Sequence, residues 1–84
     1  MTVEKVAYLL AEILGEDEKD IKEKTAFTEE YGIEPIDVAK LVISVEKKFH
    51  ITIHDDEAAG FQNVGDVAGY INKVLESHQI GYNI

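Results

Sequence analysis

The stretch between residues 35 and 49 decides the fold, and it reads Pro35-Ile36-Asp37-Val38-Ala39-Lys40-Leu41-Val42-Ile43-Ser44-Val45-Glu46-Lys47-Lys48-Phe49. Successive residues of an α-helix turn by about 100°, which sorts these side chains onto two opposite faces. The predicted core face consists of Val38, Leu41, Val42, Val45 and Phe49. The opposite face consists of Ile36, Lys40, Ile43, Ser44 and Lys47. Because proline is favoured at the first helical position, the pattern predicts an amphipathic helix that begins at Pro35.

Helical patterns also occur on both sides of this stretch. The first has apolar residues at helical spacing, with Thr2 as the expected N-cap and Gly15 as the stop: Val3, Val6, Leu10, Ile13 and Leu14. A short helix is predicted from Asp55 to Ala59 and a longer one from Val64 to about Leu75, with Asn63 and Asp66 as a capping pair. Residues 16–34 are polar and acidic and show no sustained period, so the sequence predicts an all-α protein with one long loop.

Length and composition fit one small domain. The chain has 84 residues, no cysteine and a formal net charge of -9, so disulfides and thiolate metal sites are excluded. That charge opposes binding to nucleic acid or to anionic lipid, and no apolar leader or long apolar run is present. We therefore expect a cytoplasmic monomer with no nucleic-acid and no membrane partner.

The negative charge is unevenly distributed. Residues 1–34 have ten acids and four lysines, and residues 50–84 have five acids and one lysine. Residues 35–49 have two acids and three lysines, which gives the central helix a net charge of +1. The central helix is therefore a mildly basic island in an acidic protein.

Four segments, taken in order, resemble the acyl carrier protein family: Tyr31 to Asp37, Asp37 to Phe49, Ile51 to Ala58 and Val64 to Ile71. The resemblance implies a four-helix carrier-protein bundle, with three longer helices, a short third helix and a long loop between the first two. In that fold a few apolar residues, here Ile21 and Phe27, hold the loop. The expected domain covers residues 1–76, and residues 77–84 form a short, frayed C-terminal tail.

The resemblance also identifies a substituted residue. In the family, a serine in the motif Leu-Gly-x-Asp-Ser-Leu-Asp carries a phosphopantetheine arm through a phosphodiester, and Pro35 occupies that position here. Proline has no hydroxyl group to esterify, so phosphopantetheine is not expected as a cofactor. Ser44 follows nine residues later, about 13 Å along the helix, and Thr28 and Tyr31 are outside the motif position.

The outward face of the central helix is the candidate partner-binding site, with Ile36, Asp37, Lys40, Ile43 and Lys47 as its residues. Two isoleucines bordered by lysines resemble the centre and rim of an interface, and the family meets its partners on this helix. The alternative is that isolated exposed aliphatic residues have no function. Lys40, Lys47 and Lys48 replace carboxylates of the family, so the basic enzymes of acyl synthesis are not the expected partners.

No catalytic site is predicted, and the protein is not expected to be an enzyme. The chain has no cysteine, and its three histidines are not near a nucleophile motif. The run from His54 to Glu57 contains possible metal ligands, but consecutive residues rarely converge on one ion, and the acids fit the start of a short helix. We therefore predict no metal site.

Three functions stay open from the sequence. The first is a non-covalent adaptor or regulatory domain in an acyl, polyketide or peptide assembly system. The second is an acyl carrier protein of fatty acid or polyketide biosynthesis that is modified at another site. The third is a binder of a free acyl chain or other apolar ligand. The absence of a hydroxyl group at Pro35 favours the first.

Overall fold

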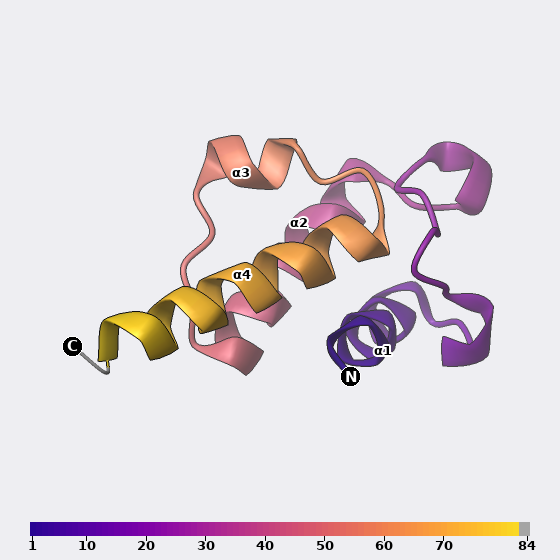
Figure 1. Cartoon of the computed structure of the whole chain (residues 1–84). Helices are drawn as coiled ribbons and strands as arrows, with labels where there is room; N and C mark the ends of the chain where they lie inside the picture. The colour runs from indigo at the N-terminus through magenta and orange to yellow at the C-terminus, as the bar shows by residue number, and fades with distance from the viewer. Residues whose placement is uncertain (83–84) are drawn as a thin grey trace.

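The computed structural model describes residues 1–82, with side chains up to residue 77. Its helices are α1 (Thr2–Leu14), α2 (Pro35–Phe49), α3 (Asp55–Ala59) and α4 (Val64–Tyr82), and two 3₁₀ turns, η1 (Glu18–Asp20) and η2 (Glu29–Tyr31), lie in the first loop. Figure 1 shows α1, α2 and α4 packed together, with α3 on the side away from α1. The predicted all-α, four-helix bundle is confirmed.

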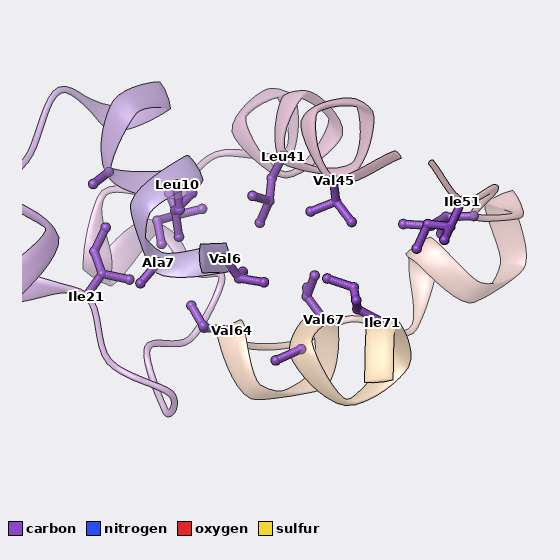
Figure 2. Packing of buried hydrophobic residues seen from close by; sticks show 14 residues of the cluster. Val6, Ala7, Leu10, Ile21, Leu41, Val45, Ile51, Val64, Val67 and Ile71 are labelled. Carbon is purple, nitrogen blue, oxygen red and sulfur yellow. The ribbon is translucent and has the colours of Figure 1, made fainter. Parts of the chain in front are cut away.

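The core lies where α1 packs against both α2 and α4. Figure 2 shows the side chains of the three helices pointing toward one another. Seven of them are completely shielded from solvent, and burial of each stabilises the fold by about 1.5–3 kcal/mol: Val6 and Leu10 of α1, Leu41 and Val45 of α2, and Val64, Val67 and Ile71 of α4.

The two predicted faces of α2 are confirmed. Leu41 and Val45 are fully buried, and the other three residues of the predicted core face are partly buried against the same cluster. On the opposite face, the exposed fractions of Ile36 and Ile43 are 61% and 51%. A period of about 3.6 residues was therefore enough to separate the core side from the free side.

The first loop is held by two buried side chains, Ile21 and Ile33, and by backbone hydrogen bonds. Ile21 is 6% exposed, as expected, and Phe27 is partly buried. The amide of Phe27 donates to the carbonyl oxygen of Gln62 at 2.9 Å, and the amide of Gly65 donates to the carbonyl oxygen of Glu23 at 2.8 Å. The loop of 19 residues, with its two 3₁₀ turns, therefore stays compact because its backbone pairs with Gln62 and with the first turn of α4.

Two predicted helix boundaries need correction. Thr2 is the first residue of α1 instead of its N-cap, and its hydroxyl donates to Oδ1 of Asn72 on α4 at 2.6 Å. The predicted end of the last helix near Leu75 is wrong, because α4 continues to Tyr82. Neither proline nor glycine occurs between Leu75 and Ile80 to stop it. The last two residues of the predicted tail, 83–84, lie outside the described residues.

Other boundaries follow the sequence. Gly15 adopts the left-handed conformation (φ 68°) that ends α1, and His50 adopts it at the end of α2 (φ 56°). Asn63 and Asp66 form the predicted capping pair, in which Oδ1 of Asn63 accepts from the Asp66 amide at 2.8 Å. Within residues 1–82, none of the helices has the length and apolar character needed to cross a membrane.

The tight contact between the first loop and α4 predicts that alanine substitutions at Gly65 and Gly69 change the free energy of unfolding in opposite directions. A Cβ at Gly65 would lie 3.0 Å from Cγ and 3.3 Å from the carbonyl oxygen of Glu23, whereas a Cβ at Gly69 would meet nothing within 4 Å. We expect Gly65→Ala to lower the free energy of unfolding by about 1 kcal/mol through overpacking. Gly69→Ala should raise it by up to about 1 kcal/mol, since alanine favours a helix. Urea denaturation measures both, and equal effects would contradict the contact.

Candidate functional site

Pro35 lies at the exposed first position of α2. The chain reaches it through Gly32 in the left-handed conformation (φ 73°), the buried Ile33 and the extended Glu34 (φ -101°, ψ 162°). An extended residue is what the proline ring requires before it, and the missing N–H of Pro35 leaves no helical hydrogen bond unmade at this position. The proline therefore fits the fold without strain.

Asp37 caps the N-terminal end of α2. Its Oδ2 accepts from the amide of Glu34 at 2.9 Å, which is one half of a capping box. Asp37 is half-buried and lies about a quarter turn or more away from the stripe that contains Ile36 and Ile43. Of the five residues predicted to bind a partner, Asp37 is therefore the one with a clear structural role.

The other four predicted residues form one exposed stripe along α2, which we call the α2 ridge: Ile36, Lys40, Ile43 and Lys47. Among the residues with described side chains, the single ion pair joins the Met1 amino group to Glu4 at 3.4 Å, so neither lysine of the ridge is paired. Lys48 lies apart from the ridge, because it lines a hollow against α1 with Lys5 and Tyr8.

A groove lies beside the ridge, between α2 and α3, and consists of two adjoining hollows. One has a volume of about 430 Å³ and the other about 380 Å³, and they share Pro35, Val38, Ala58 and Ala59. We call this the α2–α3 groove. The larger hollow also contains Ile43 of the ridge, and Thr28 lines the smaller one. The groove is therefore mostly apolar and opens next to the start of α2.

Two hydrogen bonds set the position of α3, which forms one wall of the groove. The Glu46 carboxylate accepts from the amide of Ile53 at 2.8 Å, and the Tyr70 hydroxyl donates to the Glu57 carboxylate at 2.8 Å. The Tyr70 ring also meets Phe61 edge to face, with 5.7 Å between centroids. Sequence reasoning missed these roles, because partners 7 and 13 residues apart leave no local pattern.

The acidic run in the first turn of α3, Asp55 to Glu57, lies at the helix start where it was expected. Oε1 of Glu57 accepts from the amide of His54 at 3.3 Å, across the first turn of α3. Among the side chains that the structure describes, no three histidine, aspartate or glutamate residues are grouped closely enough to hold a metal ion. The acids of this run therefore act on the helix end.

Comparisons with known proteins agree with this architecture. Residues 4–71 match the family described as "Phosphopantetheine attachment site". The acyl carrier protein of Clostridium acetobutylicum is 37% identical over 76 residues, which are 90% of this chain and 99% of that protein. Acyl carrier proteins of Exiguobacterium sibiricum and Wolinella succinogenes are each 40% identical, over 74% and 75% of this chain and 78% and 83% of theirs.

The bond between Tyr70 and Glu57 predicts a pH-dependent contribution to stability. Burial first, and then the hydrogen bond to Glu57 and its charge, raise the pKa of Tyr70 above the ordinary value of 10.0. A raised folded-state pKa means that the contribution is complete below pH 10 and is lost as the pH rises through the folded-state pKa. Tyr70→Phe should therefore lower the free energy of unfolding at pH 7 by about 1 kcal/mol and remove this alkaline loss.

The matched control is Tyr8→Phe, which removes an exposed bond to Glu12 within α1. We expect little change in stability, because both groups of that pair are in water. Hydrogen exchange provides a second measurement, since Tyr70→Phe should speed exchange of the α3 amides and Tyr8→Phe should not. Equal exchange rates at α3 in the two variants would show that Tyr70 does not hold α3.

The role assigned to Asp37 predicts a loss of stability when it is replaced. Asp37→Ala removes the acceptor of the Glu34 amide and should lower the free energy of unfolding by about 1 kcal/mol. Lys40→Ala, one turn further along α2, should change it by less than about 0.5 kcal/mol because this lysine is exposed and unpaired. Urea midpoints measure both, and equal values would disprove the capping role.

Proposed function

The chain belongs to the acyl carrier protein family, and we propose that it acts there without a covalent arm, as an adaptor or regulatory domain that docks a protein partner. Members of this family are carriers and not enzymes, so no reaction is assigned to the chain itself. We place it in an acyl, polyketide or peptide assembly system, as a cytoplasmic monomer.

The chemistry of Pro35 is the observation on which the proposal rests. The family normally bears phosphopantetheine, and we take the exposed Pro35 at the start of α2 as the attachment position, because Tyr31 to Asp37 resembles the family's motif. A pyrrolidine ring has no oxygen that could form the phosphodiester. The residues of this site therefore do not fit the arm, and we derive no step that uses it.

The intact first turn of α2 around Pro35 also supports a role without a covalent arm. The first turn of α2 is complete, with Pro35 at the first position and Asp37 bonded to the Glu34 amide. The fold is therefore intact at the point where the chemistry is missing. We infer that the domain kept the surface for partners while it lost the site for cargo.

The α2 ridge is the surface that we propose for the partner. Ile36 and Ile43 expose more than half of their area, and two unpaired lysines border them. Apolar residues at the centre with charges at the rim are the usual anatomy of an interface. The domain boundary that we propose encloses this surface within residues 1–76.

One observation favours a second candidate, a carrier modified at another hydroxyl. Thr28 lines the same hollow as Pro35, so its side chain lies on the face where the family's attachment residue is found. Ser44 is half-buried and lies on the far side of the ridge, two and a half turns along α2. Thr28 is therefore the hydroxyl that a test must include.

The decisive measurement is the intact mass after incubation with coenzyme A and a phosphopantetheinyl transferase of broad specificity. We expect the natural protein to keep its mass and Pro35→Ser to gain one arm, because the variant restores a hydroxyl at the start of an unchanged helix. Circular dichroism of both proteins checks that the fold is the same.

A third protein, Thr28→Val, separates the two candidate functions. If the natural protein gains an arm and Thr28→Val does not, the chain is a carrier modified at Thr28 and the adaptor proposal is wrong. If the natural protein and Pro35→Ser both stay unmodified, the resemblance does not place the attachment position at residue 35.

A further inference from the structure

The α2 ridge and the α2–α3 groove form one continuous surface. Ile43 belongs to both, since it is half-exposed on the ridge and also lines the larger hollow with Pro35 and Val42. This surface offers a partner two kinds of contact. The partner can cover the exposed isoleucines of the ridge, and it can insert a side chain into the groove. Surfaces of this kind are typical places for interface anchors.

The two edges of this surface have opposite charge. Beyond the isoleucines lie Lys40 and Lys47, at about 30–60° further round α2. Across the groove lies the exposed Asp55 of α3. Glu46 of α2 lines the same hollow, and its carboxylate accepts from the Ile53 amide. A partner that covers the whole surface therefore meets cations along one edge and carboxylates along the other.

We propose that the partner docks an amphipathic helix here, with carboxylates along one edge of its apolar face and lysine or arginine along the other. This inference rests on the proposed docking function and names the chemistry of its partner. Opposite charges placed face to face favour this pattern, and like charges disfavour a helix that is acidic or basic on both edges.

The architecture explains why the docked segment is a helix. Within residues 1–82 the β-structure is limited to one isolated bridge, between Ala26 and Asn63, so these residues offer no sheet edge to which a strand could be added. The groove runs beside a helix of 15 residues, and helices bind such grooves with residues spaced three and four apart. A helix also presents its two charged edges at fixed positions beside one apolar stripe.

The test uses displayed helical peptides of 15 residues, the length of α2. Every peptide has leucines on one stripe, and each position on the two flanking edges is glutamate or lysine at random. Selection at 0.15 M salt limits attraction by distant charges, since the screening length there is about 8 Å. The protein used is the natural chain, with its mass checked for the absence of an arm.

We expect the selected peptides to have glutamate on one edge and lysine on the other. Either chain direction satisfies this pattern, because a helix turned end to end in the groove exchanges its edges. Lys40→Glu with Lys47→Glu makes both edges of the surface acidic, so selection should move to lysine on both edges. The original best peptide should bind this variant roughly tenfold more weakly.

The matched control is Lys48→Glu with Lys73→Glu, which changes the net charge equally at positions outside the surface. Its selected peptides should be those of the natural protein. Edges without charge preference, the same charge on both edges, or an equal change with the control pair would overturn the inference. The peptide selection tests only this inference. Failure of the proposed function is detected separately, by a gain of one phosphopantetheine arm in the intact mass of the natural protein.

Discussion

The burial of Val6 and Leu10 of α1 against α2 and α4 is the constraint on which the other features depend. Because this seam takes Leu41 and Val45 of α2, the opposite face of the helix has no partner among the described side chains. The same helix therefore stabilises the fold with Leu41 and Val45 and exposes Ile36 and Ile43. The rotational setting of α2 against α1 decides which residues are available to another protein.

The groove depends on a second, weaker set of interactions. The short α3 contributes no residue to the fully buried core. Glu46 bonds to the Ile53 amide just before α3, and Tyr70 bonds to Glu57 in its middle. A wall attached in this way opens at lower free energy than the three longer helices. Glu46 and Tyr70 lie on α2 and α4, so the stability of the bundle determines how firmly the groove keeps its shape.

The sequence predicted what depends on neighbours along one helix and missed what depends on distant contacts. Both faces of α2, its start at Pro35 and the length of α3 follow from periodicity and capping, and all agree with the structure. The predicted end of the last helix, near Leu75, was wrong, because no strong stop signal follows that residue and α4 continues to Tyr82. Asp37, which was predicted to belong to the partner surface, also bonds to the Glu34 amide, and its part in partner binding stays a prediction.

The position of Pro35 has a consequence for how this protein changes over time. The first residue of a helix needs no N–H, so neither proline nor serine leaves a helical hydrogen bond unmade there. Proline is the residue favoured at this position, so selection for a stable fold alone favours Pro35 over serine. A serine would persist at residue 35 only where the function of the protein required its hydroxyl group.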